Sequence, residues 1–145
     1  MKNVSKPMRC LFTGLILTLI ASVPVGICYE VNKVTDKILY AIFGNRFNEP
    51  VEVMYLLMND MTLYKITSNY ESHIYATLYD IGKKLDRDGY EISDILIIIH
   101  GHKSSRYFST ADVATWRRFK RAGFTGKFCL YLERNKTIYE ITEDE

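Results

Sequence analysis

Two histidines and an aspartate in the second half of the chain have the types and spacing to hold a metal ion. His100 and His102 end an unbroken aliphatic run, Asp94 to Ile99, that is typical of a strand buried on both faces. Side chains two residues apart on a strand point to the same face, so we expect both imidazoles to converge. Asp112 follows ten residues after His102, at the predicted start of a helix, where its carboxylate can fold back over the same place. Two imidazoles, one carboxylate and one open position are typical of catalytic rather than structural zinc.

Asp112 also has a purely structural explanation. Ser109 and Asp112 have the spacing of a capping box, in which Ser109 is the N-cap of a helix that needs no metal. A His-x-His pair is likewise a weak indication when it stands alone. The two patterns occur together here, after a buried strand and across a short loop, and this combination favours a metal site.

These residues resemble the metal motif of the JAMM (MPN-domain, JAB-like) zinc metalloproteases, which is written H-x-H-P, a short loop, then S-x-x-D. The family also has a catalytic glutamate upstream, on an early strand, in an E-x-x-G context. Glu52 lies 48 residues before His100 and resembles that glutamate in order and separation. The loop of seven residues from Lys103 to Ser109 is most similar to the shorter bacterial members. The resemblance covers about residues 49 to 142.

The resemblance implies a role for each residue of the motif. His100, His102 and Asp112 would bind Zn²⁺. Glu52 would be the general base that takes a proton from the zinc-bound water and returns it to the leaving amine. Ser109 would donate a hydrogen bond to the developing oxyanion. The implied protein is a metallopeptidase that hydrolyses peptide or isopeptide bonds within a single MPN/JAB-like domain.

Two positions differ from the family pattern. Lys103 stands where the family has proline, and Tyr55 stands where it commonly has glycine. Lys103 adds a positive charge beside the expected dication, which opposes metal binding unless its flexible stem carries the ammonium away. A catalytically inactive MPN-like module that binds a protein or peptide in the cell envelope is therefore the alternative, and zinc stoichiometry distinguishes the two.

Other hydrolase classes fit the sequence less well. The chain has no Gly-x-Ser-x-Gly nucleophile elbow, and the part after residue 28 is too short for a serine α/β-hydrolase. Cys129 lies inside an apolar strand pattern, so we expect a buried, inert thiol rather than a nucleophile.

The periodicity of the apolar residues predicts the helices and strands that would position the site. Together they indicate a single α/β domain with a mixed sheet and packed helices. The aliphatic run before His100 is expected at the centre of the sheet. Helices are predicted over 30–43, from Ser68 or Asn69 to Leu85, and over 109–121. Strands are predicted over 51–58, 61–67, 94–99, 127–133 and 136–142, with hairpins at Asn59-Asp60 and Arg134-Asn135.

The first 28 residues have the pattern of an export signal. Three basic residues and no acidic residue precede an uncharged stretch over 10–28, whose most apolar part, Leu11 to Ala21, is short for a membrane span. Small residues around Gly26 predict cleavage before Tyr29, with an uncleaved membrane anchor as the alternative. Either way residues 29–145 form the domain and are delivered across the membrane, to the periplasm or the medium.

Charge narrows the class of partner. The chain of 145 residues has a net charge of +2, and removal of residues 1–28 leaves 16 basic and 17 acidic side chains. A net charge of −1 excludes a nucleic-acid binder held by counterion release, so we expect a peptide or protein substrate. Membrane contact is expected only through an uncleaved N-terminal segment, and the sequence predicts no particular oligomeric state. The same cleavage leaves Cys129 as the single cysteine, so no disulfide framework is expected.

Overall fold

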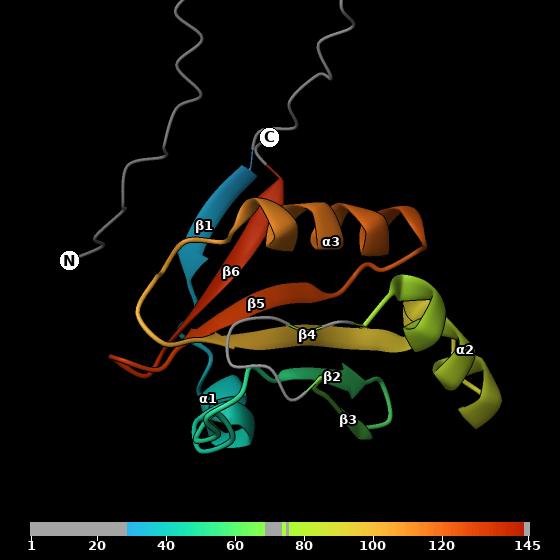
Figure 1. The fold of residues 1–145 in the computed structure, drawn as a ribbon, viewed down its shortest axis with the longest axis horizontal. Coiled ribbons are helices and arrows are strands. Elements are labelled where there is room, and N and C mark those ends of the chain that lie inside the picture. The colour runs from blue at the N-terminus through green and yellow to red at the C-terminus, as the bar shows by residue number, and fades with distance from the viewer. Residues whose placement is uncertain (1–28, 69–73, 75, 144–145) are drawn as a thin grey trace, which may run out of the picture.

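A mixed six-stranded sheet forms the centre of the protein, in the order β1-β6-β5-β4-β2-β3 (Figure 1). The computed structural model describes residues 29–68, 74 and 76–143. Among these residues the β4–β5 pair alone is parallel, and every other pair is antiparallel. The strands are β1 (Tyr29–Lys33), β2 (Met54–Met58), β3 (Leu63–Ile66), β4 (Ile95–His102), β5 (Lys127–Leu132) and β6 (Thr137–Glu143).

Strand β4 occupies the interior of the sheet, as its aliphatic composition predicts. It pairs with β2 on one side and with β5 on the other, and the side chains of Ile98 and Ile99 are completely buried. A strand buried on both faces needs apolar residues at consecutive positions, and the run before His100 supplies them. The strand continues through His102, beyond the predicted end at residue 99, so both histidines belong to the sheet.

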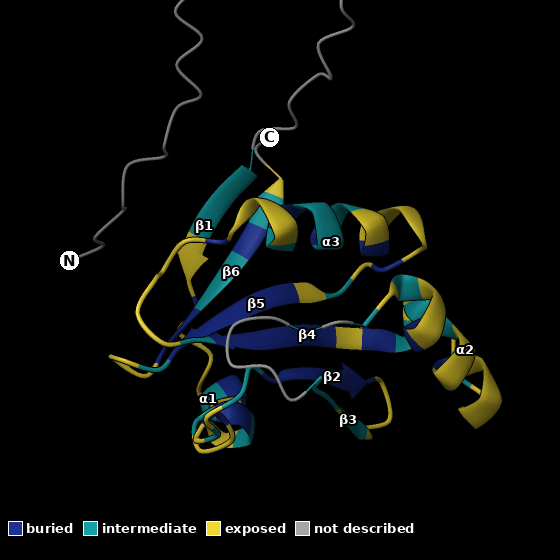
Figure 2. Ribbon diagram, in the orientation of Figure 1, coloured by how far each residue is buried: buried dark blue, intermediate teal, exposed yellow. Residues whose placement is uncertain are grey.

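Helices cover both faces of the sheet, and each face has its own apolar core (Figure 2). Helices α2 (Leu78–Asp88) and α3 (Thr110–Arg121) pack on one face, where Trp116 and Phe119 are buried. Helix α1 (Lys37–Phe43) packs on the other face, where Phe43 is completely buried. A short 3₁₀ turn, η1 (Ile92–Asp94), leads into β4.

The crossover from β4 through α3 to β5 determines where α3 begins. Parallel neighbours require a long connection, and here a loop leaves the end of β4 at His102 and turns back into α3 at Thr110. This return brings the N-terminus of α3 close to the end of β4. The predicted strand–loop–helix order and the predicted helix over 109–121 are confirmed, with Ser109 as the N-cap.

The prediction of one helix over 30–43 is wrong in its first half. Residues 29–33 form β1, which pairs with β6 at an edge of the sheet, and α1 starts after the N-cap Asp36. The Asp36 Oδ1 accepts a hydrogen bond of 2.8 Å from the Ile38 backbone N–H. Apolar residues at 31 and 34 fit a helix, but alternation over 29–33 also fits a strand, and pairing with β6 decides between the two periods.

The second predicted helix begins later than expected. Its N-cap is Thr77, whose hydroxyl accepts from the Asp80 backbone N–H at 3.1 Å, and Ile74 lies before the helix. Of the two predicted caps, Ser68 lies outside the helix and Asn69 lies outside the described residues. The helix continues to Asp88, three residues beyond the predicted end at Leu85, and Gly89 ends it with the left-handed φ of 85° that ends many helices.

The predicted export signal lies outside the described residues, as does Cys28. Within residues 29–68, 74 and 76–143, no helix is both long enough and apolar enough to cross a membrane. The two predicted hairpins lie within the described part and are confirmed, β2–β3 and β5–β6.

Two glycines should respond to alanine in opposite directions. A Cβ at Gly126, before β5, would lie 2.2 Å from the Leu96 backbone oxygen, so Gly126→Ala should lower the free energy of unfolding by about 2 kcal/mol or more. Gly82 in α2 has no heavy atom within 4 Å of such a Cβ, and Gly82→Ala should raise the free energy of unfolding by about 0.5–1 kcal/mol. Urea denaturation measures both. Equal changes in the free energy of unfolding of the two variants would contradict the close contact between Gly126 and the Leu96 backbone.

Candidate metal centre

The end of β4 presents two imidazoles to the face of the sheet that α3 covers. His100 and His102 lie on the same face, and their Nε2 atoms are 3.1 Å apart. The His102 Nδ1 lies 3.2 Å from the Ser105 carbonyl oxygen. If Nδ1–H donates to this carbonyl, the lone pair of the neutral ring is on Nε2 and points into the site, which is the arrangement of metal-ligating histidines.

Helix α3 contributes the carboxylate of Asp112. Its Oδ1 lies 3.1 Å from the His100 Nε2, and its Oδ2 lies 3.4 Å from the His102 Nε2. Asp112 is also part of a complete capping box, because its Oδ2 accepts from the Ser109 N–H at 2.6 Å and the Ser109 Oγ accepts from the Asp112 N–H at 3.1 Å. The capping and metal interpretations of the sequence therefore do not exclude each other: one carboxylate contacts both the helix start and the imidazoles.

Pairing between β2 and β4 places Glu52 at the same site. Met54 is opposite His100, and the Gly101 N–H donates to the Val53 carbonyl at 3.2 Å. Two positions further on, the same antiparallel register would put Glu52 opposite His102 and on the same face. A carboxylate oxygen of Glu52 and one nitrogen from each histidine lie within 4.8 Å of one another, so these three residues could bind a metal ion.

Each short distance between two donor atoms is close to that between two ligands of a small tetrahedral ion, with the two Asp112 distances measured to different oxygens. Two ligands about 2.0–2.1 Å from zinc at the tetrahedral angle are about 3.3–3.4 Å apart. The contacts among His100 Nε2, His102 Nε2 and the Asp112 oxygens are 3.1, 3.1 and 3.4 Å. The donor set is nitrogen and carboxylate oxygen, which suits zinc and other divalent transition metals.

The electrostatics of the site also favour a cation among these groups. Burial lowers the pKa of His102, but the hydrogen bond and the negative charge of Asp112 outweigh it and raise the pKa overall. Burial likewise raises the pKa of Asp112, and hydrogen bonds with His100 and His102 outweigh it and hold the pKa far below its usual range. Positive charge placed among these donor atoms is therefore stabilised, whether a proton or a metal ion supplies it.

The donor atoms lie at the inner wall of a cavity of about 480 Å³. His100 is 3% exposed and packs against the rings of Phe108 and Phe128, with centroids 6.0 and 5.9 Å away. Glu52, Ser109 and Asp112 line the same cavity. The structure thus brings together the five residues proposed from the sequence: Glu52, His100, His102, Ser109 and Asp112.

Gly101 and Glu133 lie beside the site, and the sequence predicted no role for either of them. Gly101 separates the histidines, and a Cβ there would lie 2.7 Å from the ring of Phe47 on the opposite face of the sheet. Glu133 follows β5, donates its backbone N–H to the His102 carbonyl at 2.9 Å, and lines the cavity. Burial raises the pKa of Glu133, and the charge of Lys103 partly offsets this. The β4–β5 register would have indicated Glu133, but the sequence does not show which strands pair.

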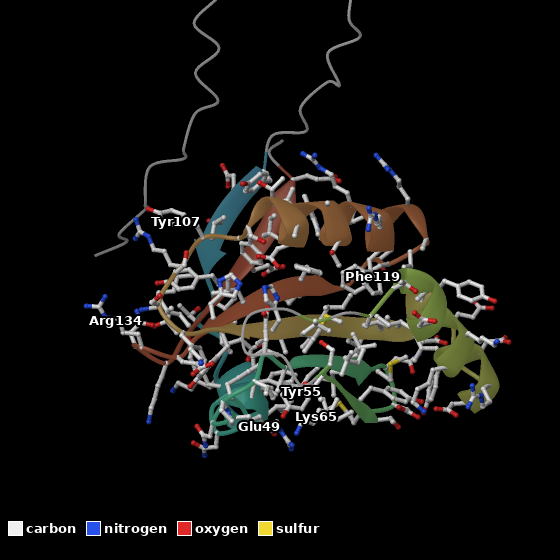
Figure 3. The ribbon with its side chains drawn as sticks, in the orientation of Figure 1. Glu49, Tyr55, Lys65, Tyr107, Phe119 and Arg134 are labelled. Carbon is white, nitrogen blue, oxygen red and sulfur yellow. The ribbon has the colours of Figure 1, made fainter. Side chains whose placement is uncertain are left out.

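The two residues that differ from the family pattern form hydrogen bonds with backbone carbonyls away from the donor atoms. Lys103 directs its ammonium to the Pro50 carbonyl, at 3.4 Å. Tyr55 is buried on the face opposite the histidines, where its hydroxyl donates to the Arg46 carbonyl at 3.1 Å. Glu49, the other acidic residue near the start of β2, forms an ion pair with Lys65 (Figure 3).

Cys129 has no access to this site. It lies on the α1 face of the sheet and is completely buried. Burial raises the pKa of its thiol to about 12, so the thiolate required of a nucleophile is not formed near neutral pH. The expectation of a buried thiol is confirmed.

Comparisons of the chain with protein-family models, with curated proteins and with solved structures find no match. Its function therefore has to be inferred from the chemistry of the site.

Removing the Ser109 hydroxyl should weaken the start of α3. Ser109→Ala deletes the acceptor for the Asp112 N–H, and loss of such a cap lowers the free energy of unfolding by about 1 kcal/mol. Ser104→Ala, at an exposed position of the same loop, should change it by less than about 0.5 kcal/mol. Thermal or urea denaturation of both variants tests this, and an unchanged Ser109→Ala protein would show that the capping box does not hold Asp112.

Proposed function

We propose that the protein is an exported, zinc-dependent hydrolase of peptide or isopeptide bonds, with a single domain of the JAMM/MPN type. The observation that carries this proposal is the convergence of His100, His102 and Asp112 at spacings that suit a tetrahedral ion, with Glu52 beside them. The strand–loop–helix order that supplies these ligands agrees with the resemblance in the sequence.

The proposed ligands are His100, His102 and Asp112, which leaves an open position toward the cavity. Bound zinc would supply an acidic water and polarise the scissile carbonyl. The His102 Nδ1 contact with the Ser105 carbonyl keeps the ring in the orientation and tautomer that a ligand needs.

Glu52 is proposed as the general base rather than a fourth ligand. Its carboxylate lies near both histidines and comes from the chain just before β2, whereas Asp112 comes from α3. Glu52 would accept a proton from the attacking water and donate that proton to the leaving amine. Ser109 accepts a hydrogen bond from the Asp112 N–H through its oxygen, so its hydroxyl hydrogen is available to donate to the developing oxyanion.

Metal content should follow the proposed ligands. Elemental mass spectrometry of the protein purified without chelator should find about one zinc per chain, and His100→Ala or Asp112→Ala should lose it. Asp94→Ala is a matched control, because Asp94 also closes a capping box, at η1, but has no histidine beside it. Zinc retained by a variant lacking both histidines, or no zinc in the wild type after zinc is added, would contradict the site.

Glu52→Gln should separate binding from catalysis. The amide cannot accept the proton, so the variant should keep zinc and lose hydrolysis of a panel of peptide and isopeptide substrates by about 100-fold or more. Loss of zinc in Glu52→Gln would instead make Glu52 a ligand. Zinc bound by a wild type that hydrolyses none of the panel would favour an inactive, peptide-binding module.

A further inference from the structure

A second cavity, also of about 480 Å³, lies between α2 and α3 beside the metal centre. The two cavities have four lining residues in common, so the second cavity is next to the first. The shared wall contains residues from β2, from α3 and from the chain before α2: Met54, Thr115, Ile74 and Ala76.

The second cavity is lined mainly by apolar side chains. Leu78 and Ile81 contribute from α2, and Phe119 contributes from α3. Figure 3 shows Phe119 between α3 and the sheet. A side chain of a bound peptide that enters this cavity would bury apolar surface, which favours aliphatic or aromatic residues.

Arg118 lines this apolar cavity from the exposed side of α3. Among residues 29–68, 74 and 76–143, no carboxylate lies within ion-pair distance of Arg118, whereas its neighbour Lys120 pairs with Glu143 at 3.5 Å. An arginine among the residues that line an apolar cavity is complementary to a ligand that carries a carboxylate next to an apolar side chain.

The spacing along α3 relates Arg118 to the metal ligands. Arg118 follows Asp112 by six residues, which corresponds to about 9 Å along a helix axis. An extended peptide advances about 3.3 Å per residue, so a peptide along this wall covers the distance with about two or three residues.

We propose that the cavity between α2 and α3 binds the part of the substrate next to the scissile bond, and that Arg118 binds a carboxylate two or three residues from that bond. The substrate is then a peptide with an apolar side chain followed by a carboxylate. This inference rests on the proposed function for the position of the scissile bond, but binding in the cavity itself does not require hydrolysis.

Fluorescence polarisation with labelled peptides tests the proposal. The first probe is fluorescein-Gly-Ala-Leu-Leu with a free C-terminal carboxylate, compared with its C-terminal amide. In a second pair of probes the C-terminus is an amide and the last residue is either glutamate or glutamine. Comparison of the two pairs shows whether the protein prefers a main-chain or a side-chain carboxylate. The full-length wild-type protein should bind one carboxylate probe about tenfold more tightly than its uncharged partner.

Arg118→Gln should remove that preference, and Arg121→Gln, an exposed arginine on the same helix that does not line the cavity, should keep it. Replacing the leucines of the preferred probe by glycine should weaken binding by about tenfold or more. Equal affinity for charged and uncharged probes, equal effects of the two arginine variants, or no binding at millimolar peptide would overturn the proposal.

The same titrations with zinc-loaded and chelator-treated protein separate this inference from the proposed function. A carboxylate preference in a protein that binds no zinc would retain the Arg118 site and reject the metallopeptidase. Bound zinc without any carboxylate preference would retain the metal site and reject the Arg118 site.

Discussion

The carboxylate of Asp112 is the point at which the fold and the site depend on each other. One of its oxygens accepts from the Ser109 N–H at the start of α3, and both face the imidazoles at the end of β4. The crossover from β4 through α3 to β5 brings these two ends together, and the capping box fixes the side-chain direction of Asp112. A substitution at Asp112 therefore affects both helix formation and the donor set.

Much of the fold follows from local sequence patterns. The aliphatic run before His100 has the composition of a buried interior strand, and Gly89 marks the end of α2. The prediction for the first segment was wrong because Val31 and Val34 have helical spacing, whereas Tyr29 and Val31 also alternate as in a strand. The pairing of β1 with β6, a contact between distant parts of the chain, decides in favour of the strand. Such pairing depends on tertiary structure, which a single sequence does not reveal.

The site was easier to predict than its surroundings, because the chemistry depends on spacing within one strand–loop–helix unit. His100, His102 and Asp112 lie within that unit, whereas Glu52 was identified through the resemblance alone. Glu133 lies beside the site because β5 pairs with β4. This pairing joins distant parts of the chain, so nothing in the sequence around Glu133 indicated its position. The apolar cavity at Phe119 depends on how two helices lie on the sheet, and helical periodicity indicates a buried face without indicating a gap between helices.

The coordination of zinc added to the protein is the most direct test of this account. X-ray absorption spectroscopy at the zinc edge of the metal-loaded protein should show two imidazole nitrogens with oxygen ligands at about 2.0–2.2 Å and no sulfur neighbour at about 2.3 Å. That spectrum would agree with a centre built from His100, His102 and Asp112. A sulfur neighbour, or zinc surrounded by oxygen without imidazole, would contradict it.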